Sequence, residues 1–397
     1  MPVMNLDVNP NPDDILAASA HRNPYPFYAA LVAGPALVFD APRKLWIASS
    51  AASVKAVLAH PALRVRPLAE PVPAAILGSA AGEVFSHLVR MNEGLKHDAP
   101  KLALQRFLAS VDLERVQART QELALQAAGE GVLRGAALSR WAFDVPVMAV
   151  ADLLGFDEAE LPQVARWMGD FVACLSPIST PAQLAAAGDA ASALLERFSE
   201  LVKASAFRPG SALACLQREA AQAGWQDARA LLCNAVGLLS QTYEATAGLA
   251  GNSIVALATQ PGLLEAVGRE PGQLLQMVNE VSRYDPSIHN TRRFVAEATE
   301  VAGVSLQAGE VVLVVLAAAG RDPACNSLPD EFLLERPDRE VPGFGHGAHQ
   351  CPGQALACTI VAAAVQALLV SGRLEEAASF SWDYRPSMNA RIPHFTG

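Results

Sequence analysis

The longest apolar stretch of the chain lies near its middle. Residues 231–260 carry one charge, that of Glu244, and would extend about 45 Å as a helix. The stretch is long enough to span a bilayer, but polar residues such as Asn234 and Asn252 interrupt it repeatedly. We therefore predict a long helix that crosses the interior of a large protein and is buried on all sides, and no membrane anchor.

Shorter elements are predicted on both sides of this helix. The periodicity and the turn residues indicate a short helix at 23–32, a strand hairpin at 36–40 and 44–49, a helix capped by Ser50 that ends before Pro61, helices from about 100 to 285, β-rich runs at 299–323, a last helix after Gly353, and irregular strand and loop at 380–395. Strands thus occur toward both ends of the chain. If they pair in one sheet, the chain does not divide into two domains, although 397 residues exceed what one core usually holds. The predicted fold is mainly α with a small β region.

Composition narrows the class of protein. Hydrophobic residues make up 51% of the chain and charged residues 18%, which favours a large core and argues against disorder. The net charge of −10 offers no basic surface for a phosphate backbone, so nucleic acid is not an expected partner. Residues 1–14 lack the basic and apolar regions of a signal peptide, and no CxxC pair occurs among the six cysteines. We expect a soluble cytoplasmic protein with free thiols.

One glycine-rich stretch concentrates possible metal ligands. It reads GFGHGAHQCPGQALA at residues 343–357 and contains His346, His349 and Cys351. A structural zinc site needs four ligands, and no further cysteine or histidine lies near in sequence, which argues against zinc. The alternative is one thiolate. Glycines allow the backbone to approach a flat group closely, and a cysteine just before a helix is favoured as a thiolate, which is what a haem iron needs as an axial ligand.

The same stretch resembles the haem-binding signature of the cytochrome P-450 family, F-x-x-G-x-x-x-C-x-G. The fixed positions of that signature fall on Phe344, Gly347, Cys351 and Gly353. About seventy residues upstream, NEVSRYDP supplies an E-x-x-R pair, Glu280 and Arg283, which the family also requires as a structural element. Residues 320–338 and 384–395 look like the family as well. The resemblance covers essentially all of 1–397 and is greatest to the soluble bacterial members. It implies a single-domain cytochrome P-450 fold, haem b as cofactor and Cys351 as the iron ligand.

The resemblance also implies partners for the two haem propionates. In LKHDAPK (95–101), His97 matches the family's histidine, and Lys101 stands where arginine is common and would lose bidentate pairing. Arg293, with Arg292 as its rival, and His349 occupy the other propionate positions. Phe344, Gly345 and Gly353 are expected to border the cofactor. His346 occupies a variable position of the motif.

The central helix departs from the family pattern A-G-x-D/E-T. Here the chain reads QTYEATAG: Glu244 matches the acid, Gln241 and Thr242 replace Ala-Gly, and Ala245 stands at the position of the alcohol that helps deliver protons, with Thr246 next to it. One residue is about 100° of helix rotation, so Thr246 does not simply replace it. Three explanations stay open: a local bulge that rotates Thr246 or Thr242, a substrate hydroxyl or ordered water that completes the proton chain, or a protein that does not activate dioxygen in the usual way.

A second departure follows the cysteine. The family normally has an aliphatic residue there, whose backbone N–H points at the sulfur, whereas Pro352 has no N–H. One donor fewer leaves the sulfur more electron-rich and lowers the iron potential. We hypothesise that Pro352 partly offsets the missing alcohol at position 245.

The resemblance implies a haem-thiolate monooxygenase that inserts one oxygen atom from dioxygen into an organic substrate. Because the chain has no flavin or iron–sulfur domain, a ferredoxin or flavodoxin-type redox partner must supply electrons. Two alternatives stay open because of Ala245: a peroxide-driven or non-oxygenating haem-thiolate enzyme, and a haem-binding sensor. Peroxide-using members often hold a fatty-acid carboxylate with an arginine of the central helix, and none occurs at 231–260.

We expect the substrate pocket to be lined by four segments: residues 70–90, 236–246, 286–291 and 388–392. The residues expected to line it are Gln241, Thr242, Ile288, His289 and Met388. Because residues 73–89 are small and apolar, we expect a mainly apolar small molecule of secondary metabolism, free or tethered to a carrier protein. The enzyme is expected to act as a monomer, without a membrane.

Overall fold

Strands from the two ends of the chain meet in one sheet. The computed structural model describes residues 12, 14–176, 178–205, 210–374 and 381–396, so most of the N-terminal stretch read for a signal peptide lies outside the described residues. The strands are β1 (Leu37–Asp40), β2 (Leu45–Ala48), β3 (Leu63–Arg64), β4 (Thr291–Val295), β5 (Thr299–Val301), β6 (Val304–Leu306), β7 (Val311–Val314), β8 (Ser381–Tyr384) and β9 (Pro393–Thr396). The main sheet has the order β1-β2-β7-β4-β3.

Pairing in this sheet links distant parts of the sequence. The predicted hairpin is present as β1 and β2, which pair antiparallel, with Leu37 opposite Ala48. β2 then pairs in parallel with β7, and β4 joins β7 to β3, with Leu63 opposite Val295. The expectation that N- and C-terminal strands share a sheet is confirmed. Residues 315–323 differ from the expected β structure, because the chain turns there into α13 (Leu316–Gly320), whose five residues are all buried.

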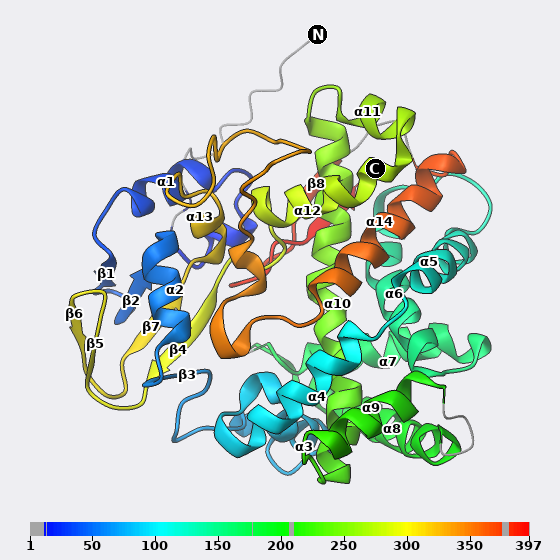
Figure 1. Ribbon diagram of the computed structural model, residues 1–397, viewed down its shortest axis with the longest axis horizontal. Coiled ribbons are helices and arrows are strands. Elements are labelled where there is room, and N and C mark those ends of the chain that lie inside the picture. Colours follow the sequence, from blue (N-terminus) through cyan, green and yellow to red (C-terminus); the bar gives the residue numbers. More distant parts are fainter. Residues whose placement is uncertain (1–11, 13, 177, 206–209, 375–380, 397) are drawn as a thin grey trace.

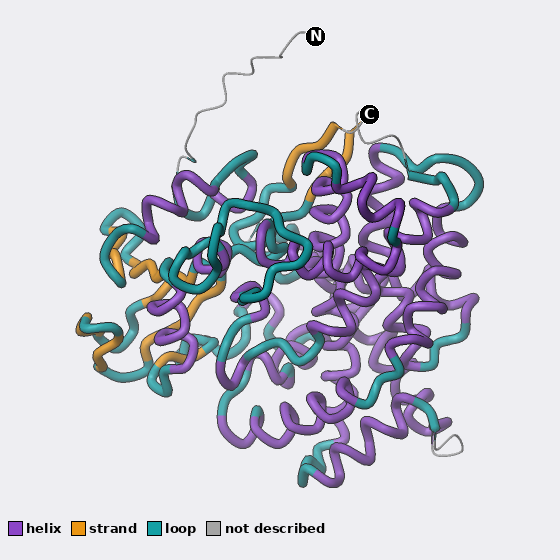
Figure 2. The backbone as a smooth tube through the Cα atoms, turned by 45° about the horizontal axis from the view of Figure 1, so that its top comes forward, coloured by secondary structure: helices purple, strands orange, loops and turns teal. Residues whose placement is uncertain are grey.

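Helices make up the rest of the fold and lie mainly to one side of the sheet (Figures 1 and 2). They are α1 (Tyr25–Val32), α2 (Ala51–Ala59), α3 (Ala80–His87), α4 (Asp98–Ala109), α5 (Leu113–Ala128), α6 (Gly135–Leu154), α7 (Leu161–Ala173), α8 (Pro181–Ser205), α9 (Ala212–Gln222), α10 (Ala228–Thr259), α11 (Leu263–Arg269), α12 (Leu274–Tyr284), α13 and α14 (Gln354–Val370). Ser50 caps α2 as expected, by accepting a hydrogen bond from the Ser53 N–H.

The long apolar stretch forms α10, which runs through the whole molecule in Figure 1. Every residue from 246 to 257 is buried. Residues 241–245 are not, because this part of the helix borders a cavity. The prediction of burial on all sides is therefore right for one half of the helix and wrong at its centre.

The C-terminal tail packs directly on α10, and small residues make this possible. A Cβ atom on Gly248 would lie 2.8 Å from the Arg391 carbonyl oxygen, and one on Gly251 would lie 2.8 Å from Pro393 Cδ. Such distances are below any normal contact, so a larger residue at either position would push the tail away. The tail forms β8 and β9 as an antiparallel pair.

One stretch, Gly347–Val370, is long and apolar enough to cross a membrane by composition alone. About 61% of that window is buried inside the fold, where α14 packs against α5, α10 and α12. This is the placement of a core helix.

Candidate functional site

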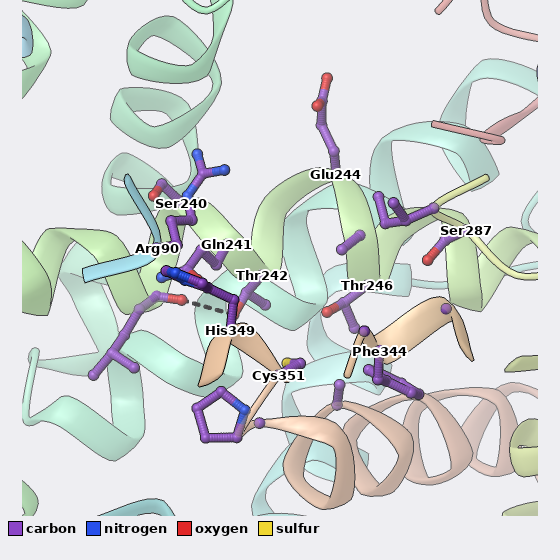
Figure 3. A pocket seen from close by; sticks show the side chains of 18 of the residues that line it. Arg90, Ser240, Gln241, Thr242, Glu244, Thr246, Ser287, Phe344, His349 and Cys351 are labelled. Carbon is purple, nitrogen blue, oxygen red and sulfur yellow. Dashed lines mark hydrogen bonds between the residues drawn. The ribbon is translucent and has the colours of Figure 1, made fainter. Parts of the chain in front are cut away.

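A cavity of about 440 Å³ lies between α10 and the loop that precedes α14. Most of the residues singled out in the sequence border it: His97, Lys101, Gln241, Thr242, Glu244, Ala245, Thr246, Ile288, Arg293, Phe344, Gly345, His349, Cys351 and Gly353. They come from α4, α10, the segment before β4, β4 itself and the cysteine loop. The fold thus brings together residues that are up to 256 positions apart, as Figure 3 shows for part of the set.

The cysteine loop presents Cys351 to this cavity. Two 3₁₀ turns, Pro342–Phe344 and Gly347–His349, shape the loop, and the Cys351 N–H donates to the Phe344 carbonyl oxygen over 2.8 Å. Gly345 and Gly347 have φ of +78° and +70°, a region that favours glycine. The loop geometry therefore depends on these two glycines.

The Cys351 sulfur is reachable from the cavity, although protein surrounds the site on its other sides. Burial raises the pKa of the thiol, while a hydrogen bond from the Gly353 backbone and the positive charge of Lys101 oppose the rise. The Lys101 ammonium donates to the Gln350 carbonyl oxygen, directly before the cysteine. Lys101 thus contacts the cysteine loop, and its charge acts on the sulfur.

Three further polar side chains lie along the same wall. His97 is 3% exposed; its Nδ1 contacts the Asp98 carboxylate at 2.9 Å, and its Nε2 is buried without a hydrogen-bond partner. The His349 ring lies 4.3 Å from the His97 ring, centroid to centroid. Arg293 is 5% exposed, and burial lowers its pKa. A cluster of buried donors is therefore available to an anionic group.

Arg293 and its rival Arg292 are distinguished by burial. Both border the cavity, but successive residues of a strand face opposite sides, and in β4 only Arg293 is buried while Arg292 is exposed. His349 carries a feature that the sequence did not indicate: its Nε2 lies 3.0 Å from Glu93 Oε2. A carboxylate thus already contacts one of the expected propionate partners.

Glu280 and Arg283 form a fully buried ion pair away from the cavity opening. Arg283 Nη2 lies 2.7 Å from Glu280 Oε1, and both side chains are 0% exposed. Arg336 and Arg339 also bond to Glu280, at 3.1 and 3.0 Å, and Arg283 donates to the carbonyl oxygens of Gly320, Pro329 and Glu331. Burial alone would raise the pKa of Glu280, but these arginines lower it below its usual value.

The register of α10 assigns its polar residues to two faces. Figure 3 shows the Thr246 side chain on the face of α10 toward Cys351 and the Glu244 carboxylate pointing away from that sulfur. Residues two apart on a helix are about 200° apart around it, so the two side chains point in different directions although both residues border the cavity. The helix is regular from Ala228 to Thr259 without a bulge. The hydroxyl that faces Cys351 is therefore that of Thr246. The alanine at position 245 does not leave this face of the helix without an alcohol.

The two threonines of this face differ in their hydrogen bonds. Thr242 Oγ1 donates to the Leu238 carbonyl oxygen over 2.8 Å, which occupies its proton. Thr246 makes no hydrogen bond through its side chain within the described part of the chain, and it borders the cavity. On the other face, Glu244 is exposed, but surrounding protein raises the pKa of its carboxyl, and the charges of Arg385 and Arg90 only partly oppose this.

Two residues expected in the pocket lie outside it. The His289 side chain is 0% exposed, because its ring turns away from the cavity and toward α1. There its Nδ1 contacts the Tyr28 hydroxyl at 2.9 Å. Met388 is 39% exposed at the surface, while its neighbour Asn389 borders the cavity. The structure corrects both expectations. His346 is exposed and does not border the cavity, and among the described residues no group of three metal-ligating side chains comes together.

Comparison with known proteins agrees with this geometry. A family model described as Cytochrome P450 matches residues 273–377. The chain is 31% identical over 245 residues to the 6-deoxyerythronolide B hydroxylase of Saccharopolyspora erythraea; the match covers 61% of the chain but only 59% of the hydroxylase. It is 29% identical over 365 residues to the cytochrome P450 monooxygenase PikC of Streptomyces venezuelae, covering 87% and 83%. By these comparisons the chain is similar to cytochrome P450s.

The fold is similar as well. The crystal structure of CalO2 matches with a TM-score of 0.81 at 24% identity, over 96% of this chain and 97% of CalO2. The predicted cytochrome P450 fold, mainly α with a small β region, is thereby confirmed.

Cytochrome P450s carry haem b, and the cavity has the features that this group requires. Cys351 offers a sulfur at the cavity wall for the iron. The buried guanidinium of Arg293 supplies donors for a propionate, and the unpartnered Nε2 of His97 can donate to one when the ring carries both protons. A buried polar atom without a hydrogen-bond partner is costly, so the unpartnered His97 Nε2 is itself a sign of a polar occupant.

Proposed function

We propose that the protein is a haem-thiolate monooxygenase that inserts one oxygen atom from dioxygen into an organic substrate. The observation that supports it is the placement of the Cys351 sulfur and the Thr246 hydroxyl on opposing walls of one cavity. Haem bound to Cys351 would supply dioxygen activation. His97, Arg293 and His349 would hold its propionates, and Phe344, Gly345 and Gly353 would border it.

The chain's own residues supply proton handling and exclusion of water. Thr246 Oγ1 can accept a proton and donate its own, since no protein group occupies it within the described residues. Glu244 points away from Cys351, so it would serve as a proton reservoir on the far face of α10 and not as a direct donor. Apolar side chains from α4, α6 and α7 border the remaining cavity, which limits water and suits a mainly apolar substrate.

Electrons would come from a separate ferredoxin or flavodoxin-type partner. We further propose that the protein acts as a cytoplasmic monomer on a small molecule of secondary metabolism, since relatives such as PikC and the 6-deoxyerythronolide B hydroxylase carry names of that kind. The alternatives without oxygen activation rested on Ala245, and a cavity-facing Thr246 removes their main support.

Two measurements test the proposal. The reduced, carbon monoxide-treated protein should show the Soret band of a thiolate-ligated haem, and Cys351→Ser should lose it. Product should then require dioxygen together with a reductase and ferredoxin. Turnover with peroxide alone would favour the peroxide-driven alternative, and haem binding without turnover would favour a sensor.

A further inference from the structure

Arg90 is a cation without a partner in the cavity wall. It borders the cavity, its Nε atom is buried without a hydrogen bond, and within the described residues its guanidinium makes no ion pair closer than 4 Å. An N–H donor that is shielded from solvent and has no hydrogen-bond acceptor is unfavourable. Such a group points to an occupant that is absent from the protein chain alone.

The backbone around Arg90 is fixed against α10. The N–H of Val89 donates to Asn234 Oδ1 over 2.9 Å, and Asn234 Nδ2 donates to the His87 carbonyl oxygen over 2.7 Å. Leu88 packs where a Cβ on Gly237 would lie 2.7 Å from its Cδ2 atom. The backbone that carries Arg90 is thus held in place, which reduces the conformational entropy lost when the guanidinium binds a ligand.

The charge on Arg90 is not neutralised by its surroundings. Burial lowers its pKa to about 10, so the group stays protonated at neutral pH. Glu244 is the carboxylate that acts on it electrostatically, but the two form no ion pair, and Arg66 adds a second positive charge nearby. The cavity therefore has a region of net positive potential at Arg90.

The haem propionates have other partners available. His97, Arg293 and His349 form the cluster described above, whereas Figure 3 shows the Arg90 guanidinium well separated from Cys351. Apolar side chains, including Leu238 and Leu104, border the same cavity. An apolar molecule with one anionic end would fit this arrangement.

We propose that Arg90 binds the carboxylate of the substrate, so that the substrate class is an organic acid with an apolar body oxidised away from its acid group. The planar guanidinium fork matches a carboxylate in a bidentate pair. This inference rests on the proposed function only for treating the cavity as the substrate site.

Equilibrium binding on the haem-loaded protein tests it without turnover. Dodecanoic acid and dodecanamide are compared by calorimetry and by the shift of the Soret band. The wild type should bind the acid more tightly than the amide. Arg90→Met should weaken binding of the acid on the order of 10–100-fold, as expected for charge-assisted hydrogen bonds, and leave the amide within about twofold. Arg90→Lys, which keeps the charge but loses the fork, should lie between.

Arg106→Met is the control. Arg106 is an exposed cation of α4 that does not border the cavity, so its removal should leave the ratio of acid to amide affinity unchanged. An unchanged ratio in both Arg90→Met and Arg90→Lys would overturn the inference. So would a lowered haem content in Arg90→Met with an unchanged ratio, because Arg90 would then serve a propionate. A protein that shows the ratio change but no turnover would refute the proposed function and keep this inference.

Discussion

Glu244 and Thr246 lie on opposite faces of α10, and Thr246 is the one that faces Cys351. The family pattern places acid and alcohol at adjacent positions, where both can reach one site. In this chain they are two residues apart, about 200° around the helix. The alcohol is therefore retained, and the acid is displaced to the far face.

This arrangement predicts the effect of removing the hydroxyl. In Thr246→Ala, product formation should fall on the order of 10²-fold, the usual contribution of a positioned proton donor, while consumption of reducing equivalents continues. Product, dioxygen and cofactor consumption are measured together. Ser253→Ala is the control, since Ser253 is buried on the same helix and bonds to the Leu249 carbonyl. If Ala245→Thr restored product formation in the Thr246→Ala background, the assigned register would be refuted.

The Glu280 cluster predicts a large loss of stability. Glu280→Gln removes the one carboxylate that faces Arg283, Arg336 and Arg339, and should lower the free energy of unfolding by about 3–5 kcal/mol, because buried charges are left unpaired. Urea denaturation of the haem-loaded protein measures it.

Glu265→Gln serves as the control for this substitution. Glu265 pairs with Arg269 at the surface, where both side chains are more than half exposed, so the change should be within about 0.5 kcal/mol. Equal effects of the two substitutions would contradict the structural role of Glu280.

Substitution of Pro352 is predicted to change the reduction potential of the bound haem. Replacing it by leucine restores a backbone N–H beside the Cys351 sulfur, where the Gly353 N–H already donates. An added donor withdraws electron density from the thiolate, so the potential of the bound haem should rise. Spectroelectrochemical titration measures it. Pro352→Ala should shift the potential in the same direction, because it adds the same N–H with a smaller side chain; no shift in either variant contradicts the hypothesis.

The buried His289 is predicted to make the free energy of unfolding depend on pH. Burial lowers its pKa from 6.5 to about 4, so the folded protein keeps the ring neutral where the unfolded chain already protonates it. The free energy of unfolding is therefore highest above pH 6.5. It falls by about 3 kcal/mol in total as the pH falls toward 4. His289→Gln should flatten this part of the stability profile, whereas His394→Gln, at an exposed position, should not. Parallel profiles for all three proteins would show that His289 does not titrate in this range.

The sequence predicted the elements whose signal is local. The cysteine loop was predictable because Gly345, Gly347 and Gly353 leave few backbone alternatives around Cys351, and α10 was predictable from its apolar length. The sharing of one sheet by both ends of the chain followed from where the β-rich runs occur. Ser50 was recognised as a cap because capping depends on residues only three apart.

Other features depend on side-chain direction or on contacts across the fold. The register of α10 was misjudged because Glu244 was matched to the acid of the pattern, which moved the alcohol to 245. His289 was assigned to the pocket because it lies in the segment 286–291, but its ring turns toward Tyr28. Arg336, Arg339 and Glu93 gave no signal at all, since a charged residue in a loop is usually at the surface. Arg90 lay within the expected pocket segment 70–90, but no role was assigned to it.

The pairing of β3 with β4 and of β2 with β7 has a consequence during synthesis. Leu63 leaves the ribosome long before Val295, its partner in the sheet. The β1–β2 hairpin and β3 therefore have unpaired strand edges until all of α3 to α12 have been made. Exposed strand edges are sites of aggregation, and contacts between distant residues form slowly. The strand that carries Arg293 and the cysteine loop are made after these helices, so a nascent chain can acquire its cofactor only once both have been synthesised.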